Sequence, residues 1–287
     1  MMKYLCIGFV FLGCLLTAGC PVPYTPPTPG KIWYGNDTVT GRGMYLYIPM
    51  KYRKDTPMPI LISCHGTPPW DVAEHHSRTW EWYAERYGFI LLCPKLDGTD
   101  GIFGSGASGA MKSSERYILS MISMLSYRYN VDRNNIWITG FSGGGFPAYW
   151  VGLRNPDVFS CIVAQNANFN ERNTDGWYPL ASNASGLKMM IYYGEGDPAP
   201  IVLQSENAIR YLRSMGFHPY AKTIPGGHER HPEVAMAWLL QNKRTPIGTL
   251  MTPGTTPAGA GRNGSTYTGG SGLNDPIHLQ GPRPEAP

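Results

Sequence analysis

The strongest constraint on this chain is a glycine-rich hexapeptide that directly follows an apolar run. The run is Ile136–Thr139, and the hexapeptide Gly140–Gly145 carries Ser142 in the pattern Gly-x-Ser-x-Gly. This pattern between a β-rich run and a helix-compatible segment is typical of a strand that turns sharply into a helix with the serine exposed. In so tight a turn, side chains at Gly140 and Gly144 would clash and the serine backbone would be strained. We therefore predict that Ser142 is a nucleophile, the alternative being a glycine-rich turn that happens to contain a serine.

The rest of the chain alternates between short apolar runs and segments with helical periodicity. Apolar runs typical of buried strands cover residues 59–64, 89–94, 136–139, 159–164, 188–193 and 221–225, and helical periodicity covers 77–87, 111–129, 205–215 and 232–241. Residues 32–35 and 43–49 are expected to add an antiparallel pair. The alternation predicts an α/β fold, one domain over residues 31–244, with a mostly parallel central sheet and helices on both faces. About twenty residues separate Ala164 from Lys188, too few for a large helical lid, which predicts an open cleft.

A serine hydroxyl at neutral pH needs an adjacent base, which in turn needs an orienting acid. Asp197 is the predicted acid because it follows the run that ends at Tyr193, in the turn Gly194–Pro198. Its alternative role is that of a turn residue before proline. Glu195 is a rival too close to the strand end, and Glu171 and Asp175 are rivals that follow an earlier strand.

His228 is the predicted base. It follows the last apolar run through Gly226 and Gly227, which permit the bend that would direct an imidazole toward the serine. His231 is the main rival, with a capping or surface position as its alternative role. His218 precedes a proline and is expected in a surface loop.

Two preorganised N–H donors are needed to stabilise the negative oxygen that forms when the serine attacks a carbonyl. The first expected donor is the amide of Gly143, directly after the serine and at the positive end of the following helix. The second is expected in the loop after the first buried strand, at the amide of Thr67. His65 is expected to brace that loop.

These motifs together resemble the α/β-hydrolase superfamily. The matching segments are His65-Gly66, Gly140–Gly144, Gly194–Asp197 and Gly226–His228, with a proline nearby at 232. Within that superfamily the chain is similar to secreted esterases of the polyhydroxybutyrate depolymerase and feruloyl esterase type over about residues 45–240. The similarity includes the sequence at residues 129–136, just before the strand that leads to Ser142.

The resemblance implies a serine esterase that forms an acyl-enzyme intermediate with an ester substrate. The alternatives are a serine peptidase of the prolyl-oligopeptidase type and a catalytically silent binding protein on the same scaffold. The proposed chemistry needs no metal or organic cofactor, and the pair His75-His76 lacks further ligands at metal-binding spacing. Trp70 and Trp177 are predicted to stack on an aromatic or sugar ring of the substrate, with simple loop packing as the alternative.

The N-terminal segment of the chain predicts export. Residues 1–20 combine Lys3, an apolar run and small residues before Cys20, as in a secretory signal. The last residues of this segment resemble a bacterial lipoprotein box, which implies lipidation of Cys20 and a membrane-anchored protein of the cell envelope; a soluble secreted protein is the alternative. Residues 21–30 are proline-rich and predict a tether, and residues 245–287 predict a disordered tail.

Charge and cysteine content complete the expectations. The formal net charge is +4, and the basic residues form no stripe, so nucleic acid is not an expected partner. Cys64, Cys93 and Cys161 lie in apolar runs typical of buried free thiols. A bridge between Cys64 and Cys93 is possible if their strands are neighbours.

Overall fold

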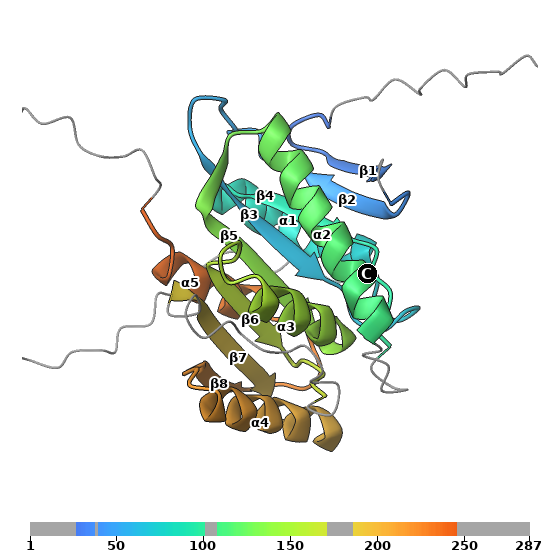
Figure 1. Cartoon of the computed structure of the whole chain (residues 1–287), viewed down its shortest axis with the longest axis vertical. Helices are drawn as coiled ribbons and strands as arrows, with labels where there is room; N and C mark the ends of the chain where they lie inside the picture. Colours follow the sequence, from blue (N-terminus) through green and yellow to red (C-terminus); the bar gives the residue numbers. More distant parts are fainter. Residues whose placement is uncertain (1–26, 38–39, 101–107, 171–185, 246–287) are drawn as a thin grey trace, which may run out of the picture.

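An eight-stranded sheet forms the centre of the computed structural model, which describes residues 27–37, 40–100, 108–170 and 186–245 (Figure 1). The strand order is β1-β2-β4-β3-β5-β6-β7-β8. The pairs β1/β2 and β2/β4 are antiparallel, and every other pair is parallel. The predicted mostly parallel sheet is therefore confirmed. The strands are β1 (Ile32–Asn36), β2 (Gly43–Tyr47), β3 (Met58–Cys64), β4 (Ile90–Pro94), β5 (Val131–Phe141), β6 (Cys161–Gln165), β7 (Lys188–Gly194) and β8 (Tyr220–Ile224).

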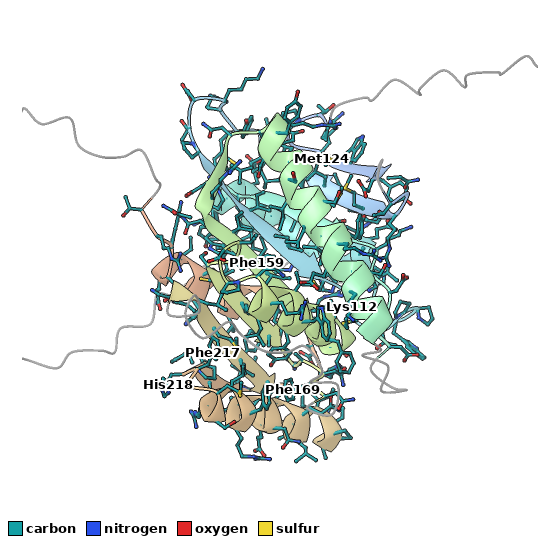
Figure 2. The ribbon with its side chains drawn as sticks, viewed as in Figure 1. Lys112, Met124, Phe159, Phe169, Phe217 and His218 are labelled. Atoms are coloured by element: carbon teal, nitrogen blue, oxygen red, sulfur yellow. The ribbon has the colours of Figure 1, made fainter. Side chains whose placement is uncertain are left out.

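Helices cover both faces of this sheet, as predicted. One face carries α2 (Ser108–Arg128), α3 (Gly145–Arg154) and α4 (Ala199–Ser214), whereas α1 (Ala73–Tyr87) and α5 (Pro232–Gln241) lie behind it in Figure 1. Phe169, which follows β6, packs its ring against Tyr149 of α3 and Tyr211 of α4 (Figure 2). Phe169, four residues after the end of β6, is thereby fixed between these two helices.

Burial on both faces explains the continuous apolar runs. Every side chain of β3 is buried. Ile60 and Ile62 pack with the α2 and α3 side of the core, whereas Leu61 shares a cluster with Trp80 of α1 on the opposite face. Successive residues of a strand point to opposite faces, so a strand covered on both sides needs apolar residues throughout.

Three elements begin earlier than predicted, and in two of them, α1 and β5, a polar residue is buried in the added part. Helix α1 begins at Ala73 rather than at residue 77, and the completely buried His76 in its first turn is hydrogen-bonded to Ser63 and Asp71. Strand β5 begins at Val131 rather than at residue 136, and its Asn135 donates to Asp132 at 2.7 Å. Helix α4 begins at Ala199 rather than at residue 205. Apolar periodicity does not detect the polar residues at the starts of α1 and β5.

Several sequence-based predictions lie outside the described residues. These are the signal segment with Cys20, most of the tether, and the tail from residue 246 onward. The segment 171–185 is also outside, so the absence of a large lid stays a prediction. No helix within the described ranges is long and apolar enough to span a bilayer. Cys64, Cys93 and Cys161 are all buried free thiols, so the possible Cys64–Cys93 bridge is not formed.

Candidate active site

Three loops meet where parallel strands β5, β7 and β8 end, and they bring Ser142, Asp197 and His228 together. The His228 Nε2 atom lies 2.9 Å from Ser142 Oγ, and its Nδ1 atom lies 2.7 Å from Asp197 Oδ1. The Asp197 side chain is fully buried, whereas 30% of the His228 side chain is exposed. A buried carboxylate therefore holds one edge of an imidazole whose other edge reaches a half-buried hydroxyl.

The turn that carries Ser142 has the predicted strained form. Ser142 has a φ of 51°, in the left-handed region that non-glycine residues rarely adopt. It opens the short 3₁₀ turn η1 (Ser142–Gly144), and α3 follows at once. A Cβ at Gly140 would overlap the Gly144 carbonyl oxygen, and a Cβ at Gly144 would overlap the Cys64 carbonyl oxygen of β3. The predicted requirement for glycine at both positions is confirmed.

Asp197 is held by donors on both carboxylate oxygens. Its Oδ2 atom accepts the Gly194 N–H at 2.8 Å and the Asn166 Nδ2–H at 2.7 Å, which leaves Oδ1 for His228. Asn166 Nδ2 also donates to the Gly227 carbonyl at 2.9 Å. One side chain thus supports both the acid and the peptide that precedes the histidine. Sequence reasoning missed Asn166; its signal was an asparagine, a residue that tolerates left-handed backbone, directly after a buried strand.

The rival residues are engaged elsewhere or lie outside the described residues. Glu195 is exposed, and Glu171 and Asp175 belong to the segment that is not described. His231 precedes α5 and pairs with Glu233 through a 2.9 Å contact at Nδ1. His218 is exposed beside the start of β8, labelled at the edge of the molecule in Figure 2.

The loop between β3 and α1, residues 65–72, is called the oxyanion loop below and lies directly beside the serine. A Cβ built at Gly66 would be 3.2 Å from the Ser142 Cβ. The Thr67 hydroxyl donates to the Thr99 carbonyl at 2.9 Å, and the Thr67 carbonyl accepts the Asp71 N–H at 3.1 Å. The two residues predicted to bind the oxyanion, Thr67 and Gly143, lie close together, since a Cβ built at Gly143 would be 2.9 Å from Thr67 Oγ1.

His65 braces this loop in its neutral form. Its Nε2 atom accepts the Leu96 N–H at 2.9 Å, so its Nδ1–H donates to the Gly66 carbonyl at 2.8 Å. Burial lowers the pKa of His65 to about 4. Because the C=O and N–H of a trans peptide point in opposite directions, holding the Gly66 carbonyl also sets the direction of the Thr67 amide.

The remaining predicted positions contribute unevenly. Trp70 is 69% exposed on the loop that follows Thr67, and Trp177 lies outside the described residues. His75 and His76 belong to α1, and His76 contacts Ser63 and Asp71 instead of forming an isolated pair. Within the described residues, no cluster of three or more His, Cys, Asp or Glu side chains could hold a metal ion.

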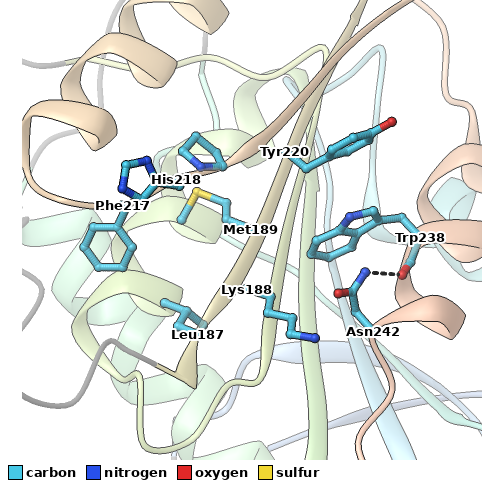
Figure 3. A pocket seen from close by; sticks show the side chains of 9 residues that line it. Leu187, Lys188, Met189, Phe217, His218, Tyr220, Trp238 and Asn242 are labelled. Carbon is cyan, nitrogen blue, oxygen red and sulfur yellow. Dashed lines mark hydrogen bonds between the residues drawn. The ribbon is translucent and has the colours of Figure 1, made fainter. Parts of the chain in front are cut away.

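A hollow of about 250 Å³ lies at the opposite end of the sheet, beside the first residues of β7 and β8 (Figure 3). Its lining residues are Leu187, Lys188, Met189, Phe217, His218, Pro219, Tyr220, Trp238 and Asn242. Since Ser142, Asp197 and His228 follow the other ends of their strands, this hollow is separate from the candidate site.

Comparison with known proteins points to esterases and to a related peptidase family. The model of the prolyl oligopeptidase family matches residues 116–186. Acetylxylan esterase A of Emericella nidulans is 24% identical over 146 residues, 48% of this chain and 47% of the relative. Feruloyl esterase B of Neurospora crassa is 29% identical over 129 residues, 42% of each chain. The matched part therefore spans about half the length of these curated relatives.

A solved structure agrees with the fold. The ferulic acid esterase of Anaeromyces mucronatus superposes with a TM-score of 0.57 at 17% identity, covering 81% of this chain and 97% of that chain. The superposition on this esterase, the order of the strands and the serine on a strained turn between β5 and α3 all indicate the same fold. The chain accordingly has the α/β-hydrolase fold, and its sequence is similar to those of acetylxylan and feruloyl esterases.

Proposed function

We propose that this protein is a serine carboxylic ester hydrolase in which Ser142 is the nucleophile, His228 the base and Asp197 the orienting acid. One observation carries the proposal: the continuous series of contacts from Asp197 Oδ1 through both His228 nitrogens to Ser142 Oγ, at 2.7 and 2.9 Å. These distances are within the range in which a base can take the hydroxyl proton. The esterase relatives support the choice of substrate bond.

In the proposed reaction, Ser142 Oγ attacks the ester carbonyl carbon while its proton passes to His228 Nε2. The amides of Gly143 and Thr67 bind the negative oxygen, and His228 then protonates the departing alcohol. Water repeats the sequence on the acyl-enzyme and releases the acid. Asp197 keeps the proton on His228 Nδ1 and stabilises the imidazolium that forms at each step.

The substrate we propose is an acetyl or aromatic acyl ester carried by a polysaccharide or another bulky alcohol. Trp70 exposes most of its ring on the oxyanion loop, where it can stack on a sugar or aromatic ring. The names of the relatives include acetylxylan and feruloyl esterases, which fits this class.

A peptidase is the second candidate, because the prolyl oligopeptidase model matches the segment that contains Ser142. Esters and amides share the acyl-enzyme route, so the two candidates differ only in the leaving group. A panel of acetyl, feruloyl and hydroxybutyrate esters beside proline-containing peptide anilides separates them. Turnover of the anilides without the esters would replace our proposal with a peptidase.

The nucleophile is tested with a fluorophosphonate probe and p-nitrophenyl acetate. We expect labelling and turnover in the wild type and the loss of both in Ser142→Ala. Loss of either triad partner typically lowers kcat by about 10⁴-fold or more, so Asp197→Asn and His228→Ala should be nearly inactive. Equal labelling and turnover in the wild type and Ser142→Ala would reject the site, and neither labelling nor turnover in the wild type would favour a catalytically silent binding protein.

We also propose that the enzyme is exported and anchored to the bacterial cell envelope by lipid on Cys20. The sequence of the first twenty residues supports this part of the proposal. Growth with an alkyne fatty acid should label the full-length wild type in the membrane fraction and leave Cys20→Ser unlabelled. Equal labelling of both forms, or none in either, would contradict lipidation at this residue.

A further inference from the structure

A second buried carboxylate, Asp71, lies in the oxyanion loop and outside the Ser142, His228 and Asp197 series. Its Oδ2 atom accepts the Gly66 N–H and a bond from His76 Nε2, each at 2.7 Å. Its Oδ1 atom accepts a hydrogen bond from Arg230 Nη1. The partners of one side chain therefore come from the loop after β3, from α1 and from the loop that carries His228.

These contacts fix the loop from several directions. The Gly66 N–H is held by the Asp71 carboxylate, and the Thr67 carbonyl is held by the Asp71 backbone N–H at 3.1 Å. Both peptides that flank the Gly66–Thr67 unit are thus tied to one residue. His76 is itself secured by a 2.7 Å contact between its Nδ1 atom and the Ser63 hydroxyl on β3. The carboxylate consequently has a rigid support on the sheet.

Arg230 extends the same contact to the histidine loop. It lies two positions after His228, and its guanidinium carbon lies 5.9 Å from the centre of the Phe141 ring. That ring lies 4.9 Å from the His228 ring, at an interplanar angle of 33°. Phe141 directly precedes Ser142. Arg230 therefore contacts Asp71 of the oxyanion loop and lies over the Phe141 ring, which is next to the nucleophile and packs against His228.

The charge of Asp71 suits this position. Burial alone would raise its pKa, but His76, Arg230 and the Gly66 N–H together hold the pKa well below its usual range. All three partners are donors, and an ionised carboxylate accepts from all of them. An asparagine would instead turn an NH₂ group toward one of these donors. Charge, as well as shape, is therefore required at this position.

We propose that Asp71 is a positioning residue that fixes the Gly66–Thr67 peptide for oxyanion binding and couples it, through Arg230, to the loop that carries His228. This inference rests on the proposed ester hydrolysis. It predicts a lower kcat with a nearly unchanged KM. A displaced oxyanion donor stabilises the transition state less, whereas binding of the ground-state ester stays nearly the same.

The test compares Asp71→Asn, Arg230→Gln and Arg230→Lys with the wild type on p-nitrophenyl acetate. Since small displacements in an active site can lower rates by about 100-fold, we expect kcat to fall by about 10- to 100-fold in Asp71→Asn, with KM within about twofold. Affinity for phenylboronic acid, whose tetrahedral adduct on Ser142 places an oxygen at the oxyanion position, should fall in parallel with kcat. Arg230→Lys keeps the positive charge and should retain more activity than Arg230→Gln.

A double substitution tests the coupling itself. Because Arg230 acts through Asp71 in this proposal, adding Arg230→Gln to Asp71→Asn should lower kcat little further. The matched control is Glu115→Gln, which removes another part-buried carboxylate with several donors, among them Trp150 and Arg154, at the α2 and α3 contact. It should lower the melting temperature without changing kcat.

Each outcome separates the two proposals. An active wild type with an equally active Asp71→Asn, or a loss of kcat no larger than in Glu115→Gln, would overturn the role of Asp71 alone. A wild type with neither turnover nor boronic acid binding would overturn the proposed function and this inference together. If Asp71→Asn fails to fold, Arg230→Gln carries the test, since 27% of the Arg230 side chain is exposed, and unchanged kcat and boronic acid affinity in that variant would overturn the coupling.

Discussion

Replacing His65 with glutamine should make the free energy of unfolding less sensitive to acid. The imidazole is 3% exposed and is held between the Leu96 N–H and the Gly66 carbonyl. Protonation would convert Nε2 from an acceptor into a donor that faces the Leu96 N–H. The folded state therefore resists protonation, which agrees with the lowering of the His65 pKa to about 4 by burial.

The sign and size of the effect follow from proton linkage. Between the ordinary pKa of 6.5 and the folded value of about 4, the unfolded chain binds a proton at His65 that the folded chain does not. Stability is therefore lost as the pH falls through this window. A lowering of about 2.5 pKa units corresponds to about 3 kcal/mol, of which about 2 kcal/mol is lost between pH 7 and about pH 5.

Urea unfolding followed by tryptophan fluorescence measures this difference. The loss of stability between pH 7 and pH 5 should be about 2 kcal/mol larger in the wild type than in His65→Gln. At pH 7 the variant should be less stable by about 1 to 3 kcal/mol, because the buried Leu96 N–H loses its acceptor. NMR of the folded wild type should show no titration of the His65 ring between these pH values. Parallel pH dependences in the two proteins would refute the reasoning.

Three further predictions test the surroundings of the site. A Cβ at Gly143 would overlap the Thr99 carbonyl oxygen, so Gly143→Ala should lower kcat by about 10- to 100-fold, whereas Gly109→Ala, with no atom within 4 Å, should leave steady-state kinetics unchanged. Asn166→Ala should lower both kcat and the melting temperature. Asn166→Gly should recover about 1 kcal/mol of stability, because glycine adopts the left-handed backbone without strain, but it should not recover kcat. Equal kcat in the wild type and Asn166→Gly would contradict the support of Asp197 by the Asn166 side chain. Iodoacetamide should leave Cys64, Cys93 and Cys161 unmodified in the folded protein and should modify them in urea, because burial raises the pKa of these three thiols. Mass spectrometry of peptides measures the modification, and labelling of any of the three in the folded protein would contradict their burial.

The three residues predicted to be the nucleophile, the acid and the base all follow local rules. Ser142, Asp197 and His228 each lie in a glycine-containing turn just after an apolar run. Parallel strands end at the same edge of a sheet, so the pattern alone predicts that these turns meet there. The fold class follows from the same alternation of runs. Their convergence to 2.7 and 2.9 Å is the feature of the structure that the sequence pattern anticipated best.

The supporting residues could not be predicted in this way because their roles depend on pairs that are distant in the sequence. Asp71 and Arg230 are separated by 159 positions, and neither lies in a pattern that indicates the other. His76 interrupts the apolar periodicity of α1, so it concealed the start of that helix and its own contact with Asp71. Asn166 becomes informative only when β6 is known to lie between β5 and β7.

Backbone strain gives an independent view of how the site is held. Within the described part of the chain, the non-glycine residues with positive φ are Ser142 at 51° and Asn166 at 46°. They follow Phe141 and Gln165, which are register partners on the neighbouring strands β5 and β6. Strained backbone of this kind costs about 1 to 3 kcal/mol per residue and persists only where the surroundings enforce it.

Hydrogen bonds from adjacent loops supply that enforcement at both positions. The Ser142 carbonyl accepts the Asn168 N–H at 2.8 Å, and the Asn166 N–H donates to the Tyr192 carbonyl of β7 at 2.8 Å. The loop after β6 therefore holds the serine turn through Asn168 while its Asn166 side chain holds Asp197. Because the residues 166–168 directly after β6 constrain both the nucleophile and the acid, a change in their conformation would displace the two together. The strained residues Ser142 and Asn166 are thus held by hydrogen bonds at the ends of neighbouring strands β5 and β6.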